Sequence, residues 1–266
     1  MHRLDGQINN IEPRIVAIYQ NVADQEEPSL QESLSSYGWI LLDSWIAWRT
    51  LRFLLRELDI ADNVHEKWFQ TPSSYTASQL KAIWKFNDDV TAYIEKQTDK
   101  TFKNLIDNTI QSKRNASAHF TTRAVITGRD AYEIKKIFLC LSKVFLFYET
   151  GKFVQRMDNY LKQIGCTDFC VKINDEIYDA NNFLESFEQY IQTEELYVEY
   201  VDGSKKKCFL VFNRDGCFTI SKENEFSDEK YNNVLNDKIR KYDLFGNKGF
   251  YRDIELFFSS VDRSYM

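Results

Sequence analysis

The sequence predicts an α+β protein, with an N-terminal all-α up-and-down four-helix bundle (residues 1–161) followed by a small α+β domain (residues 165–266). Three observations favour this class. Gly (9) and Pro (3) are scarce among 266 residues, which favours helices over a turn-rich all-β fold. Apolar residues recur at spacings of three and four through the first part of the chain. Beyond that part, short alternating runs are separated by Asp-Gly turns.

The first two helices are expected over residues 4–23 and 29–59. The first carries an apolar stripe interrupted by Pro13, which either bends the helix or marks its true start. Between them, Pro28 and Ser29 are both suited to begin the second helix. That second segment is apolar on more than one face, which is typical of a helix at the centre of a bundle.

A long connection over residues 61–78 separates the second helix from the third. Thr76 or Ser78 can cap a third helix that runs from about 78 to 118, either broken or continuous. A fourth helix is expected from about 129 to 161. Four long amphipathic helices in sequence, with no strand between them, predict the up-and-down bundle.

The C-terminal pattern is different. Residues 169–179 alternate like a strand or a tight hairpin, and residues 181–192 read as a short helix. Residues 195–221 contain three strand-like runs, separated by turns at Asp202-Gly203 and Asp215-Gly216. Residues 227–245 are again expected to be helical. Together these segments predict a small α+β domain.

The charge excludes one class of function. The net charge is −6, and residues 151–266 are more acidic than residues 1–150. A protein that coats nucleic acid without sequence preference carries a large positive excess instead. An enzyme that contacts a few phosphates at one site does not need that excess, so a nuclease remains open.

The chain is expected to be cytoplasmic. Its five cysteines are an odd number, which suggests reduced thiols, and the start MHRLDGQINN has no hydrophobic region of a signal peptide. Charged residues interrupt its longest apolar runs, so no membrane span is predicted. The Cys spacings do not match a usual zinc site, and no phosphate-binding loop is present. No metal and no cofactor are therefore expected.

The segment QSKRNASAHF (111–120) holds the strongest candidate site. Arg114 is followed at once by Asn115, and His119 comes five positions after the arginine. RNA can be cleaved without metal when its 2′-hydroxyl attacks the adjacent phosphorus, a reaction that needs proton transfer near neutral pH and positive charge on the phosphorane. An imidazole and a guanidinium supply these two needs. Asn115 can orient the histidine or hold a phosphate oxygen.

This motif, at the end of the third of four predicted helices, resembles the signature of the HEPN superfamily (higher eukaryotes and prokaryotes nucleotide-binding domains). The resemblance covers roughly residues 1–150. It implies a metal-independent ribonuclease that works as a homodimer, with two motifs facing each other across a cleft. It also implies a toxin or antiviral effector with an RNA substrate and an antitoxin or sensor partner. One toxin subgroup has a tyrosine two positions after the histidine, whereas this chain has Thr121.

Other residues are candidates for support. Asp43 lies in the apolar run ILLDSWIAW, so its carboxylate needs a partner from another helix. We expect it to steady Arg114 or His119 from behind, although a structural pair elsewhere is the alternative. Three flanking cations are candidates to steer the RNA backbone, or are simply solvated: Lys113, Arg123 and Arg129.

A second interpretation stays open for the whole N-terminal part. In this interpretation Arg114 is an ordinary surface arginine and His119 is a half-buried histidine, and neither takes part in catalysis. The bundle would then be a non-catalytic HEPN-like module that dimerises or binds a partner. In either case the acidic C-terminal domain is expected to regulate, sense or dimerise.

Overall fold

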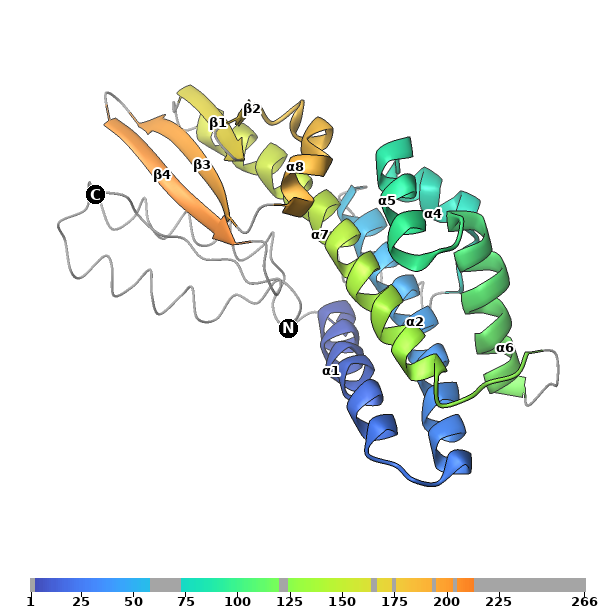
Figure 1. Cartoon of the computed structure of the whole chain (residues 1–266). Helices are drawn as coiled ribbons and strands as arrows, with labels where there is room; N and C mark the ends of the chain where they lie inside the picture. The colour runs from blue at the N-terminus through green and yellow to red at the C-terminus, as the bar shows by residue number, and fades with distance from the viewer. Residues whose placement is uncertain are drawn as a thin grey trace. The chain divides into compact units, whose positions relative to one another are not determined.

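The computed structural model describes residues 3–57, 73–119, 124–163, 167–173, 176–192, 195–202 and 205–212 (Figure 1). This part of the chain is mostly helical with a small antiparallel sheet, as the α+β prediction requires. Contacts divide the chain into two compact units, His2–Phe145 and the residues from Leu146 onward. The expected domain limits, 1–161 and 165–266, stay a prediction, since all residues beyond 212 lie outside the described ranges.

The first unit contains the long helices that the apolar pattern predicts. Helix α1 spans Arg3–Ala23 with Pro13 inside it, so the helix begins before the proline. Helix α2 spans Pro28–Glu57, and α7 spans Asp130–Gln163, with the boundary between the two units inside it.

The predicted third helix is broken. It consists of α4 (Ala77–Trp84), α5 (Asp88–Thr98), the π-helical segment η1 (Asn104–Ile110) and α6 (Gln111–His119). Helices α4 and α5 each end on a left-handed residue, Lys85 (φ 57°) and Asp99 (φ 59°). Thr76 caps α4 as predicted, in a reciprocal capping box with Gln79.

Helix α2 is the centre of this unit because its tryptophans bond to its neighbours. The Trp39 indole donates to Asp130 at the start of α7 (2.8 Å). The Trp45 indole donates to Glu12 of α1 (2.8 Å), whose carboxylate also pairs with buried Arg49 (3.2 Å). These bonds satisfy polar groups that would otherwise be costly to bury in the core.

An aromatic stack fills the space between α2, α4 and α7. The Trp84 ring lies between Phe53 (centroids 4.0 Å apart) and Phe145 (4.3 Å), with both neighbours nearly parallel to it. The Trp84 indole also donates to Thr50 (3.0 Å). Stacked aromatic pairs of this kind add to the free energy gained from burial alone.

The second unit contains the sheet. Strands β1 (Thr167–Ile173), β2 (Glu176–Tyr178), β3 (Glu195–Asp202) and β4 (Lys205–Phe212) pair antiparallel in the order β2-β1-β3-β4. The predicted hairpin over 169–179 is confirmed as β1–β2. The short helix expected over 181–192 is confirmed as the 3-10 turn Phe183–Ser186 followed by α8 (Phe187–Gln192).

The β3–β4 pairing agrees with the predicted turn after Asp202. The ladder pairs Asp202 with Lys205, which leaves a two-residue connection. The third strand-like run, the turn at Asp215-Gly216 and the helix expected over 227–245 lie outside the described residues. The core of this unit is aromatic: Phe147 contacts the rings of Phe183, Phe187 and Tyr190.

Within the described ranges, the helices are too short or too polar for any of them to cross a membrane.

Candidate functional site

Arg114 lies on α6, which packs against α2 (Figure 1). Its Nε lies 3.5 Å from Oδ2 of Asp43 on α2. The Asp43 side chain is only 10% exposed, whereas that of Arg114 is 36% exposed. The structure therefore brings together the two residues that the sequence links as a supporting carboxylate and a catalytic cation, and the guanidinium still reaches solvent.

Ser74 is a third member of this cluster. Its hydroxyl donates to Oδ2 of Asp43 at 2.6 Å. Burial raises the pKa of Asp43 above its ordinary value of 3.8, while the Ser74 hydrogen bond and the Arg114 charge act in the opposite direction. Ser74 could not be predicted from the sequence, because it lies in a connection with no pattern that points to one particular serine.

The segment that carries Ser74 is fixed against the helix of Arg114. The carbonyl of Tyr75 accepts from Gln111 Nε2 (2.9 Å) at the start of α6. The backbone N–H of Ala77 donates to Asp107 (2.8 Å) in the π-helical segment η1, which runs directly into α6. π-Helical turns are rare and occur frequently at functional sites. Two hydrogen bonds thus hold in place the segment whose Ser74 hydroxyl binds Asp43.

Asn115 contacts the arginine. Its Oδ1 accepts from Nη1 of Arg114 at 2.9 Å. A guanidinium has five N–H donors, so the contacts with Asp43 and Asn115 leave donors free to bind an anion. Of the two roles considered for Asn115, this geometry favours one in which it acts on the arginine side of the site rather than on the histidine.

His119 is the last residue of α6, and it is exposed. Five residues separate it from Arg114, which corresponds to about 140° around a helix axis. The two side chains therefore leave α6 in different directions.

Lys113 pairs with a buried carboxylate and with a backbone carbonyl. Its Nζ lies 2.8 Å from Oδ1 of Asp130 and 2.5 Å from the carbonyl oxygen of Val125. Asp130 is buried, and it also accepts from Trp39 and from the backbone N–H of Thr127. The ammonium neutralises a buried carboxylate, which supports the fold, and a contact of Lys113 with RNA stays a prediction.

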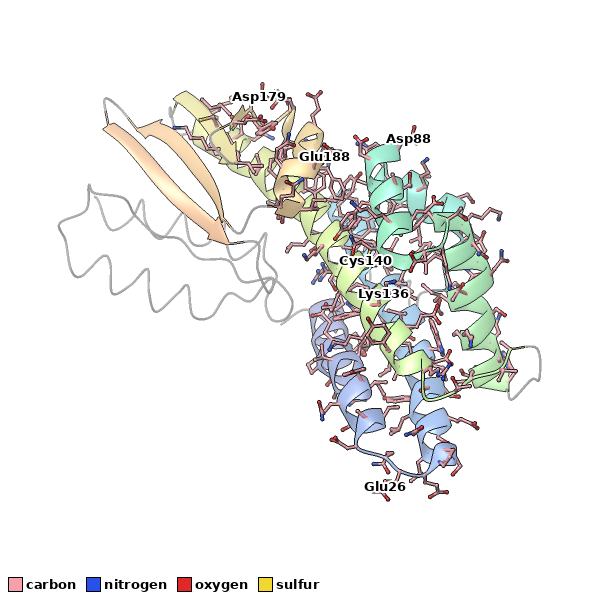
Figure 2. All side chains as sticks on the ribbon, in the orientation of Figure 1. Glu26, Asp88, Lys136, Cys140, Asp179 and Glu188 are labelled. Atoms are coloured by element: carbon pink, nitrogen blue, oxygen red, sulfur yellow. The ribbon has the colours of Figure 1, made fainter. Side chains whose placement is uncertain are left out.

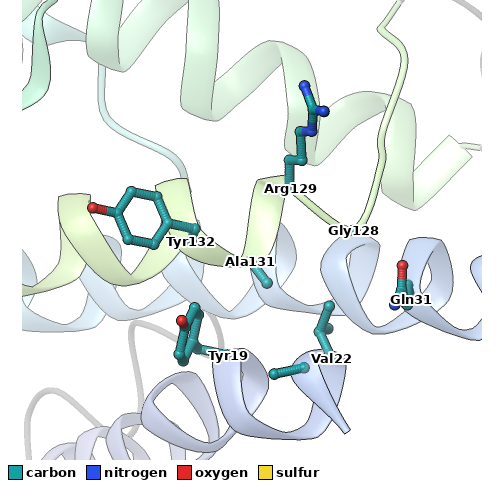
Figure 3. A pocket seen from close by; sticks show the side chains of 8 residues that line it. Tyr19, Val22, Gln31, Gly128, Arg129, Ala131 and Tyr132 are labelled. Atoms are coloured by element: carbon teal, nitrogen blue, oxygen red, sulfur yellow. The ribbon is translucent and has the colours of Figure 1, made fainter. Parts of the chain in front are cut away.

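Arg129 is exposed at the edge of a hollow of about 290 Å³ between α1, α2 and the start of α7. Figure 3 shows its side chain extending away from Tyr19 and Val22, which line the opposite side. The side chain therefore reaches solvent, and its role in steering the RNA backbone stays a prediction. Arg123 and Thr121 lie outside the described residues.

The described residues contain no group of three or more side chains suited to hold a metal ion. Within the described ranges, Cys140 is a buried free thiol. Burial raises the pKa of Cys140 to about 12, so this thiol stays protonated and is a poor ligand or nucleophile.

No protein-family model matches the chain, and comparisons with curated proteins and with solved structures also give no match. A functional proposal for this chain therefore rests on the motif and on the geometry around it.

Proposed function

We propose that this protein is a metal-independent endoribonuclease of the HEPN type, with a composite site at a dimer interface. Arg114 stabilises the transition state, His119 acts as acid or base, and Asn115 and Asp43 hold the arginine. The observation that carries the proposal is the Arg114–Asp43 pair. A half-exposed guanidinium is braced from behind by a nearly buried carboxylate at 3.5 Å.

The exposure of the two partners supports a functional rather than a structural pair. Burying a carboxylate costs free energy, and the pKa of Asp43 is raised for that reason. A pair that existed only for stability would recover this free energy best with both partners buried, as Glu12 and Arg49 are. Asp43 instead pairs with an arginine that faces solvent, and the guanidinium can there bind a ligand.

The reaction needs no co-reactant besides RNA. A base removes the proton of the 2′-hydroxyl, whose oxygen then bonds to the adjacent phosphorus. The bond from phosphorus to the 5′-oxygen breaks, and an acid protonates that oxygen. The products are a 2′,3′-cyclic phosphate and a free 5′-hydroxyl. In the proposed dimer, the two copies of His119 serve as base and acid, and Arg114 neutralises the phosphorane oxygens.

The bundle architecture and the biological role belong to the same proposal. Helices α1, α2, the broken segment from α4 to α6, and α7 correspond to the four expected helices. The role of toxin or antiviral effector, with an antitoxin or sensor partner, follows from the family resemblance. A non-catalytic module that dimerises or binds a partner is the alternative, because exposure of His119 alone does not require catalysis.

Purified wild-type protein, incubated with total RNA in excess EDTA, tests the proposal. We expect cleavage to cyclic-phosphate ends, and a decrease of at least about 100-fold for both Arg114→Ala and His119→Ala. Lys81→Ala removes an exposed lysine of α4 and is the matched control, with unchanged activity expected. Full activity in both site variants would refute the assignment, and an inactive wild type would favour the binding module.

A further inference from the structure

A second candidate site lies in the first unit, in a groove of about 380 Å³ between α5 and α7. Figure 2 labels two of its residues, Lys136 and Cys140, on α7. The residues that line it with polar or aromatic groups are Tyr93, Gln97, Tyr132, Lys135, Lys136 and Lys143. Nothing in the motif analysis points to this groove, because its residues come from two helices that are not adjacent in sequence.

The groove concentrates positive charge in a chain whose net charge is −6. Among the described residues, neither Lys135 nor Lys143 has an acidic side chain within ion-pair distance. Lys136 pairs with Asp99 at 2.8 Å, and Nζ of Lys135 lies 4.2 Å from the centre of the Tyr19 ring. Two ammonium groups thus remain without carboxylate partners, and they are available to an anionic ligand.

The aromatic residues and the floor of the groove fit the same kind of ligand. The Tyr132 ring lies 6.2 Å from that of Tyr19, tilted by 58°, yet the residue is 62% exposed, which leaves part of the ring open to stacking. Burial raises the pKa of Tyr93 to about 12, so its hydroxyl remains a hydrogen-bond donor. Burial likewise keeps the Cys140 thiol neutral, so the floor adds no negative charge that would repel a phosphate.

The proposed nuclease site offers few cations that can bind RNA. Lys113 is committed to Asp130, so Arg114 and Arg129 are the predicted RNA-contacting cations that remain within the described residues. Proteins that bind single-stranded RNA place cations along its backbone and stack aromatic rings against its bases. An acidic peptide would use the lysines but would have no use for the exposed tyrosine face.

We propose that the groove between α5 and α7 binds single-stranded RNA, with phosphates on Lys135 and Lys143 and a base against Tyr132. This inference rests on the proposed nuclease function and states where its substrate is held outside the Arg114 site.

Fluorescence anisotropy with a labelled single-stranded RNA of about 20 nucleotides tests this proposal. The full chain carries Arg114→Ala in every sample, so that the RNA is not cut. We expect the double variant Lys135→Ala/Lys143→Ala to raise Kd at least about 10-fold, and to reduce the slope of log Kd against log salt by about 1.4, since each phosphate contact in a single strand contributes about 0.7. Tyr132→Ala should raise Kd about 5-fold or more at an unchanged slope.

Lys81→Ala is the control, with the affinity of its parent expected. Circular dichroism checks that each variant is folded. An unchanged Kd and slope in the double variant would overturn the proposal, as would an absence of RNA binding. A labelled polyglutamate peptide provides a second comparison. If Lys135 and Lys143 are needed to bind this peptide but not to bind RNA, the proposal is overturned and the groove is a protein-binding surface. The nuclease proposal fails separately, when the wild type does not cut RNA.

Discussion

The burial and the charge of Asp43 together determine its effect on stability and on Arg114. Its carboxylate is almost fully covered on α2, yet its partners are a serine from a connecting segment and an arginine that reaches solvent. Desolvation by burial is the largest influence on its pKa and raises it. The free energy of unfolding is therefore lower with Asp43 ionised than it would be with a neutral group of the same shape.

Asp43→Asn is predicted to separate stability from activity. The amide keeps an oxygen that can accept from Ser74, but it removes the charge that orients Arg114. At neutral pH we expect a melting temperature equal to or above that of the wild type, and RNA cleavage reduced by up to about 100-fold. Thermal melts and cleavage rates measure the two effects. A large loss of stability with unchanged cleavage would show that the pair is structural.

The pH dependence of stability has a defined sign. The pKa of Asp43 is higher in the folded than in the unfolded protein, so the folded state binds this proton more readily. Protonation therefore favours folding as the pH falls through the raised pKa toward 3.8. The difference in stability between Asp43→Asn and the wild type should shrink over that range. Melts of both proteins at stepwise lower pH provide the measurement.

Sequence reasoning identified part of this cluster. The need for a partner from another helix followed from the apolar run around Asp43, and Arg114 followed from the motif. The serine at 74 and the pairing of Lys113 with Asp130 could not be found, because both depend on which side chains the tertiary fold brings within about 3 Å. A lysine beside a motif has the same appearance in sequence whether it binds a phosphate or a buried carboxylate.

The helices whose boundaries could be predicted from the sequence are those with a continuous apolar stripe. The boundaries of α1, α2 and α7 agree closely with the predicted ones for this reason. The breaks in the third helix depend on left-handed backbone at Lys85 and Asp99, residue types that adopt it less readily than glycine. The π-helical segment has no sequence signature, so the π-helical entry to α6 was not predictable.

The close approach of α2 to α1 and α7 depends on Gly38. A Cβ at this position would lie 2.8 Å from Cδ1 of Ile134 and 3.2 Å from Cγ2 of Ile18. Both isoleucines are buried, and Cγ2 of Ile18 is attached at the branch point and cannot swing away. The glycine therefore lets three helices pack at one level of the core.

Gly38→Ala is accordingly predicted to destabilise the protein. Overpacking costs about 1–3 kcal/mol, which exceeds the gain of about 0.5–1 kcal/mol from replacing a helical glycine. We expect a melting temperature lower by about 2–4 °C, measured by circular dichroism. Ser33→Ala, at an exposed position of the same helix, should leave it unchanged. An increase for Gly38→Ala would mean that the helices separate freely at this level.

At the scale of the whole molecule, the proposed chemistry requires more than one chain. Arg114 and His119 leave α6 in different directions, and each chain supplies one histidine from the motif, whereas the reaction uses a base and an acid. A two-fold dimer that places two motifs across one cleft would solve both problems. Such a dimer has a mass twice the 31.5 kDa of one chain, which light scattering can measure.

Mixing two inactive variants tests this composite site. Arg114→Ala and His119→Ala, unfolded together and refolded at equal concentration, should form about half of their dimers with one chain of each kind. Each mixed cleft then retains one guanidinium and one imidazole, so we expect RNA cleavage clearly above that of either variant and below that of the wild type. A site within a single chain gives no such recovery, because every chain in the mixture lacks one of the two groups. Cleavage equal to the mean of the separately refolded variants would therefore exclude the shared cleft, while leaving the roles of the individual residues to the single-variant assays.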